Sequence, residues 1–108
     1  MRSENLKGHL DVLVLRLLED GPSHGYRVIE MLRERSSGTF DLPEGTVYPV
    51  LHRLERRGLL SSSWTTGAGR RRRMYCLTGP GRLALSVGRQ DWAHFTVAVG
   101  AVLKEATV

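Results

Sequence analysis

The chain of 108 residues has room for one domain with one modest hydrophobic core, and its apolar fraction of 41% and charged fraction of 25% exclude wholesale disorder. The formal net charge is +5, and the single cysteine, Cys76, excludes an internal disulfide framework and suits a reducing cytoplasm. No apolar run is long enough to span a membrane and the N-terminus has no signal-peptide cleavage pattern, so we expect a cytoplasmic protein without a membrane partner.

The first predicted helix covers approximately residues 10–18. One of its faces is apolar, because apolar residues recur at i, i+3, i+4, i+7 and i+8 (Leu10, Leu13, Val14, Leu17 and Leu18). Val12 and Leu15 form a second apolar strip, which in a domain this small favours contact with a partner. Gly21 and Pro22 predict the end of the helix.

The second predicted helix covers residues 24–35. Ser23 is a good N-cap for it, and its inner face carries Val28, Ile29 and Leu32. The loop that follows contains the sequence SSGTF. The spacing therefore places a second amphipathic helix beside the first.

A third helix is predicted between residues 43 and 57. Its apolar face is spaced at i, i+3, i+4 and i+7 (Val47, Val50, Leu51 and Leu54), and Gly58 predicts its end. Pro49 is unfavourable inside a helix and disfavours helical angles at the residue before it. Two alternatives stay open: the helix begins near Thr46, or its first turns are irregular.

Two strands are predicted next, over residues 59–65 and 73–78, joined by the glycine-bearing sequence TGAGR. Trp64 is expected to lie across from Tyr75 on the core face. Side chains alternate along a strand, so Arg71 and Arg73 share the face of Tyr75 whereas Arg72 points outward. Arg70 is expected at the turn and Arg73 over the edge of the domain.

The last predicted element is a helix that begins near residue 79. Thr78 is a plausible cap and Pro80 suits an early helical position. Apolar residues then recur at i, i+3, i+7 and i+10 (Trp92, Phe95, Val99 and Val102). This stripe has no obvious partner inside the domain, so we expect another copy of the chain to cover it.

Three short helices, a β-hairpin and a further helix describe a winged helix-turn-helix with an added C-terminal helix. The predicted fold class is mainly α with a β-hairpin wing, or α+β. We expect residues 1–78 to form a winged-helix DNA-binding domain and residues 79–108 to form a C-terminal dimerisation helix.

Positive charge is concentrated in the second half of this predicted domain. From Leu51 to Tyr75 there are seven arginines and one acid, Glu55, so the segment carries 7 − 1 = +6 and the rest of the chain 5 − 6 = −1. Concentrated positive charge on a small domain is typical of a protein that binds a polyanion. The candidate DNA-binding residues are Thr46, Tyr48, His52, Arg53 and Arg56 on the third helix and Arg70, Arg71 and Arg72 on the hairpin.

Other classes of function have weaker support. No nucleophile elbow or phosphate-binding loop is present, and the four histidines share no metal-ligand spacing with Cys76, so we expect neither an enzyme nor a bound metal or cofactor. A winged helix used for protein–protein contact is the main alternative, and it predicts an apolar outer face on the third helix. RNA binding is a weaker third option, because aromatic stacking positions on a sheet are lacking.

Three stretches, HGYRVIEML, LPEGTVYPVLHRLERRGLL and GAGRRRRMYCLTGPGRLAL, resemble the PadR family of winged-helix transcriptional regulators. The resemblance covers roughly residues 10–85 and a tryptophan-bearing terminal helix, as in the short subfamily with one dimerisation helix. It implies a homodimeric repressor on pseudo-palindromic operator DNA, with binding often relieved by a small effector and nucleoid association while bound. It also implies basic residues at Arg70 and Arg72.

The final helix leaves two interpretations of Trp92 open. In the multidrug-binding branch of the family, planar compounds stack between such tryptophans at the centre of the dimer. Alternatively, Trp92 simply fills the dimer interface, where aromatic residues are enriched. The expected dimerisation or effector-pocket residues are Val12, Leu15, Trp92, Phe95, Val99 and Val102.

Overall fold

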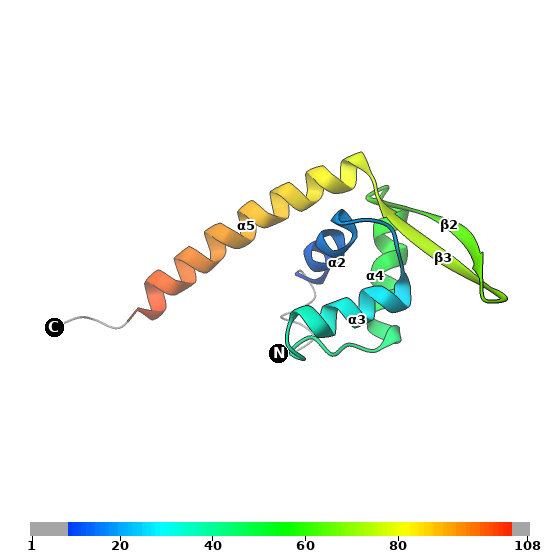
Figure 1. The fold of residues 1–108 in the computed structure, drawn as a ribbon. Helices are drawn as coiled ribbons and strands as arrows, with labels where there is room; N and C mark the ends of the chain where they lie inside the picture. Colours follow the sequence, from blue (N-terminus) through cyan, green and yellow to red (C-terminus); the bar gives the residue numbers. More distant parts are fainter. Residues whose placement is uncertain (1–8, 105–108) are drawn as a thin grey trace.

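A computed structural model describes residues 9–104. The elements follow in the order α2 (Leu10–Glu19), β1 (Ser23–His24), α3 (Gly25–Arg35), α4 (Glu44–Arg56), β2 (Leu60–Gly67), β3 (Arg70–Leu77) and α5 (Gly79–Leu103). Figure 1 shows α2, α3 and α4 gathered into one body, with the β2–β3 hairpin and α5 leaving it on opposite sides. The predicted fold class, a mainly helical α+β winged helix, is confirmed.

The hydrophobic core lies among α2, α3 and α4. It is made of most of the apolar residues predicted from the helical spacing, joined by Leu60 from β2, Tyr75 from β3 and Leu85 from α5, whereas Leu13 is only partly buried against it. Leu15 is only 2% exposed, so it belongs to this core and does not present a free surface to a partner, contrary to the prediction. The reason is that α2 is covered on two sides, by the other helices and by the first part of α5. Val12 is partly buried and contacts Gly88 of α5.

The sheet has three strands rather than the two that were predicted. β1 pairs antiparallel with β3, which lies in the middle of the order β1-β3-β2. Ser23 was expected to cap α3, but it is the first residue of β1, and His24 occupies the N-cap position without a side-chain hydrogen bond. A strand of two residues has no alternation from which it could be predicted.

The register of the hairpin also differs from the prediction. Trp64 lies opposite Arg73, and Tyr75 lies opposite Ser62, so the expected Trp64–Tyr75 pair is wrong by two residues. Ala68 and Gly69 form the turn with φ values of 51° and 74°, a tight connection that lets both strands run closer to the tip than expected. Trp64 is therefore 54% exposed rather than part of the core.

α4 begins at Glu44, with Pro43 as its N-cap, and remains helical through Pro49. This start is earlier than Thr46, so the first of the two alternatives is wrong. Its C-terminus matches the prediction at Gly58, where φ is 77°. The Gly58 amide donates a hydrogen bond to the backbone carbonyl of Glu55, and the Leu59 amide donates one to the backbone carbonyl of Leu54. This is the Schellman arrangement of a helix end.

α5 contains 25 residues and extends away from the body, as Figure 1 shows in yellow to red. Thr78 caps it as predicted, because its hydroxyl accepts a hydrogen bond of 3.0 Å from the Gly81 amide. The first part of α5 packs on α2, and the molecule measures 65 × 28 × 22 Å. The second part carries exposed apolar side chains at Trp92, Phe95, Val99 and Val102.

Candidate nucleic-acid interface

The outer face of α4 is a short strip of exposed residues opposite the core. Gly45, Pro49, His52 and Arg56 recur at i, i+4, i+7 and i+11, and all four are exposed. Nothing lies within 4 Å of a Cβ placed on Gly45. The first half of this face therefore carries no long side chain. The second half carries an imidazole and a guanidinium group, both of which donate hydrogen bonds to phosphates and base edges.

Thr46 and Tyr48, two further predicted DNA-binding residues, lie on the flanks of α4 and are half-buried. The Tyr48 ring packs over Gly25 at the start of α3, where an added Cβ would lie 2.7 Å from the Tyr48 Cε1 atom. Burial and the nearby Glu44 carboxylate raise the pKa of Tyr48, so its hydroxyl stays protonated. Its ring centroid lies 6.4 Å from that of His52.

Arg53 points toward α2 and forms an ion pair with Asp11. Arg57, which was not selected from the sequence, approaches the other carboxylate oxygen of Asp11 at 3.5 Å. Asp11 thus holds two arginines of the α4 region, and the predicted contact of Arg53 with DNA would have to compete with this pair. The pairing spans 42 residues in sequence, so helical spacing could not have revealed it.

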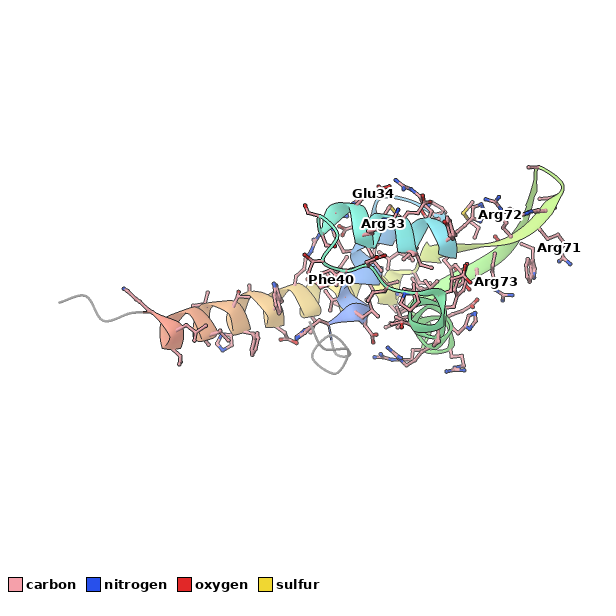
Figure 2. All side chains as sticks on the ribbon, turned by 90° about the horizontal axis from the view of Figure 1, so that it is seen from below. Arg33, Glu34, Phe40, Arg71, Arg72 and Arg73 are labelled. Carbon is pink, nitrogen blue, oxygen red and sulfur yellow. The ribbon has the colours of Figure 1, made fainter. Side chains whose placement is uncertain are left out.

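The four consecutive arginines of β3 divide into two pairs. Figure 2 shows Arg72 on one side of the hairpin and Arg71 and Arg73 on the other, as the alternation of a strand requires. The guanidinium carbons of Arg71 and Arg73 lie 4.7 Å and 5.1 Å from the ring centroid of Trp64, a cation–π arrangement. The displaced register that exposes Trp64 also creates this stacking surface.

Ion pairs separate the arginines of the chain into two groups. Those that pair with an acid of the same chain are Arg16, Arg27, Arg35, Arg53, Arg57, Arg73 and Arg89. Within residues 9–104, the arginines without such a pair are Arg33, Arg56, Arg70, Arg71, Arg72 and Arg82. Four of these six lie on the outer face of α4 and along the outer part of the hairpin. Most arginines without an acidic partner within residues 9–104 therefore lie on α4 and the hairpin, the two elements that contact DNA in winged-helix proteins.

A second candidate site lies between α2 and α5. A cleft of about 630 Å³ is lined mainly by apolar and aromatic side chains, including Val12, Phe40, Leu85, Trp92 and Phe95. The cleft also includes His9, whose ring centroid lies 5.0 Å from that of Trp92 in an edge-to-face contact. His9 was not selected from the sequence, since a lone histidine before an apolar helix carries no specific signal.

Neither a metal site nor a membrane span is found in the described part of the chain. Between residues 9 and 104, no group of three or more His, Cys, Asp and Glu side chains could hold a metal ion. In the same range, no helix combines the length and apolar character needed to cross a membrane.

Comparisons with solved structures agree with this architecture. A transcriptional regulator from Clostridium thermocellum superposes with a TM-score of 0.88 at 25% identity, over 96% of this chain and 99% of that one. A PadR family transcription regulator from Clostridium difficile superposes with a TM-score of 0.80 at 32% identity, over 89% of this chain and 99% of that one. Both are similar to this chain along nearly all of their length.

Comparisons of sequence lead to the same family. Transcriptional regulator Rv3488 of Mycobacterium tuberculosis is 39% identical over 77 residues, which cover 71% of this chain and 69% of the relative. The family model described as the transcriptional regulator PadR-like family matches residues 14–87. The family and these named relatives are regulators of transcription rather than enzymes. The chain therefore belongs to the PadR-like family of transcriptional regulators.

Proposed function

We propose that this regulator is a homodimeric repressor that binds pseudo-palindromic operator DNA in the cytoplasm and is nucleoid-associated while bound. The observation that carries the proposal is the convergence on α4 and β3 of four arginines, Arg56, Arg70, Arg71 and Arg72, that have no ion pair with an acid among residues 9–104. A protein–protein module is disfavoured, because the outer face of α4 carries His52 and Arg56 rather than apolar side chains.

In this proposal, α4 enters the major groove and the β2–β3 hairpin reaches the flanking backbone or the minor groove. His52 and Arg56 face the groove, and Thr46 and Tyr48 lie at its sides. Arg70 and Arg72 are the expected phosphate contacts of the wing. Two copies related by a twofold axis would place their α4 helices in successive major grooves, about 34 Å apart.

The second half of α5 supports the pairing of two copies. Trp92, Phe95, Val99 and Val102 are 46%, 52%, 37% and 84% exposed on a helix that leaves the body of its own chain. Exposed apolar surface of this kind marks an interaction site, and aromatic residues are enriched at such interfaces. A second α5 offers the same stripe in a self-complementary contact.

The cleft between α2 and α5 supports release of DNA by a small planar effector. Its volume of about 630 Å³ lies within the usual size of small-molecule sites, and the rings of His9, Trp92 and Phe95 line it. Because the proposed dimer contact also includes Trp92, a ligand in this cleft would act on the spacing of the two α4 helices.

The proposal is tested by measuring affinity for a mixed-sequence DNA duplex as a function of salt. We expect log K to fall linearly with log salt, and the double substitution Arg70→Ala and Arg72→Ala to reduce the slope by about 0.9 for each phosphate that is no longer neutralised. The matched control is Arg33→Ala with Arg82→Ala, which removes the same charge from exposed, unpaired positions outside the interface. Absence of binding at low salt would favour the protein–protein alternative.

A further inference from the structure

The base of the wing contains a change from three strands to two. β1 pairs only with Tyr75 and Met74 of β3, so Arg73 is the first residue of β3 toward the tip that has a neighbouring strand on one side alone. The outer part of the β2–β3 hairpin projects from the body, as Figure 1 shows. The direction of the outer hairpin, and with it the position of Arg70 and Arg72, is therefore set by whatever holds this junction.

Arg73 is held at the junction by contacts with three other elements, β2, α4 and β1. Its Nε atom donates a hydrogen bond of 2.7 Å to the Ser62 hydroxyl on β2, and its side chain approaches the Glu55 carboxylate on α4 at 3.7 Å. The Ser62 hydroxyl in turn donates to Glu55. His24 Nδ1 lies 3.3 Å from the Arg73 carbonyl oxygen. Through Glu55, the last turn of α4 thus contacts both strands of the wing.

The same network continues toward the tip through Trp64. The Arg73 guanidinium group stacks on the Trp64 ring, and that of Arg71, two residues farther out, stacks on the same ring. Trp64 lies directly opposite Arg73 in the ladder. One face of the outer hairpin is therefore occupied by contacts within the chain, which leaves Arg70 and Arg72 on the other face.

We infer that Glu55, Ser62 and Arg73 form a brace that fixes the angle of the wing relative to α4, so that Arg70 and Arg72 reach the DNA backbone while α4 occupies the groove. These are positioning residues, and the inference rests on the proposed function. Glu55 is the only acid from Leu51 to Tyr75. By charge alone it opposes DNA binding, so a geometric role accounts for an acid within this basic surface.

Stability alone does not account for the brace. The Glu55 and Arg73 side chains are 26% and 39% exposed, and partly solvated ion pairs of this kind contribute little to folding free energy. Their contribution is instead to restrict a two-stranded ribbon to one orientation before it meets DNA. Preorganisation of this kind improves affinity by removing the cost of ordering the groups during binding.

The substitution Glu55→Gln tests the brace, because a charge effect and a loss of the brace change DNA affinity in opposite directions. Removing an acid from a DNA-binding surface raises affinity if only charge matters, whereas loss of the brace lowers it. We expect affinity for a DNA duplex to fall by about five-fold, because the neutral amide loses the ion pair with Arg73 and keeps only one of the two acceptor oxygens. The matched control is Glu34→Gln at the opposite end of α3 from the sheet, where an ion pair with Arg27 is removed. This control is expected to leave affinity unchanged.

A second variant, Arg73→Lys, keeps the charge but cannot contact Ser62 and Glu55 through a planar fork. We expect the same fall in affinity and, in both variants, weaker hydroxyl-radical protection of the backbone beside the groove occupied by α4. Neither change should lower affinity further when Arg70 and Arg72 are already alanine, because the brace acts through them.

Melting temperature separates this effect from unfolding, and each variant is expected to melt close to the parent chain. If the parent binds DNA while Glu55→Gln binds equally or more tightly, the inferred role of the brace is wrong, and the proposed function is unaffected. If the parent itself does not bind, the proposed function fails. An equal fall in affinity in the background without Arg70 and Arg72 would also overturn the brace.

Discussion

Arg53 and Arg56 lie one turn apart on α4, but their charges have different surroundings. Arg53 is engaged by Asp11 from α2, whereas Arg56 is exposed and has no acidic partner in the described part of the chain. A guanidinium group that must first break an ion pair with a carboxylate gains less binding free energy from a phosphate than a guanidinium group without such a pair. In the proposed complex, Arg56 would therefore be more available to DNA than Arg53.

We accordingly expect Arg56→Ala to weaken DNA binding by about 1 to 3 kcal/mol and Arg53→Ala to weaken it by less. Titration of one fluorescent duplex with both variants at the same salt concentration measures the difference. Both variants should retain the melting temperature of the parent within a few degrees, because neither side chain is part of the core. An Arg53→Ala variant that binds more weakly than Arg56→Ala would show that Asp11 does not restrain Arg53.

The direction of a single side chain could be predicted from the sequence only where local spacing determines it. The alternation of a strand correctly separates Arg72 from Arg71 and Arg73, since neighbouring side chains must point to opposite faces. The pairing of Arg53 with Asp11 was not predictable, because it joins residues brought together only by the packing of two helices. The stacking surface of Trp64 was missed for the same reason.

At the scale of elements, the caps were predicted more reliably than the pairings. Gly58 and Thr78 were identified from residues within one turn, and both have the expected hydrogen bonds. β1 and the hairpin register depend on contacts between distant segments and on the geometry of a tight turn, neither of which changes the apolar pattern. The helix ends at Gly58 and Thr78 are thus encoded locally, whereas the cap expected at Ser23 is displaced by the pairing of β1, and the arrangement of the wing is not encoded locally.

The entry into α5 gives a prediction at this scale. A Cβ added to Gly81 would lie 2.0 Å from the Leu59 carbonyl oxygen, so the start of the helix would have to move away from the loop before β2. We expect Gly81→Ala to lower the free energy of unfolding by about 1 to 3 kcal/mol in urea denaturation.

Gly79→Ala is the matched control, because nothing lies within 4 Å of a Cβ placed there. It should leave the free energy of unfolding nearly unchanged. If Gly81→Ala is as stable as this control, the close packing of α5 against Leu59 is not present in solution.

For the whole molecule, the exposed stripe of α5 predicts the oligomeric state. We expect the parent chain to sediment as a dimer and the double substitution Trp92→Ala and Val99→Ala to sediment mainly as a monomer at the same concentration. The control is Val97→Ala, whose side chain is 73% exposed about 140° around the helix from Trp92. A double variant that remains a stable dimer would place the interface elsewhere.

The whole molecule combines two surfaces that lie far apart on one chain. Arginines without an acidic partner in the described part of the chain lie on α4 and the wing, and an apolar stripe lies on the distal part of α5. In the proposed dimer both surfaces are used at once, because pairing through α5 would set the distance between the two α4 helices. The symmetry of the proposed dimer would therefore appear in the DNA sequence that it prefers.

Selection of bound duplexes from a random DNA pool tests this coupling of dimer and operator symmetry most directly. We predict enrichment of an inverted repeat whose half-site centres lie about 10 to 10.5 base pairs apart, as expected for two α4 helices in successive major grooves. Enrichment of a single asymmetric site, or no enrichment even at low salt, would contradict it.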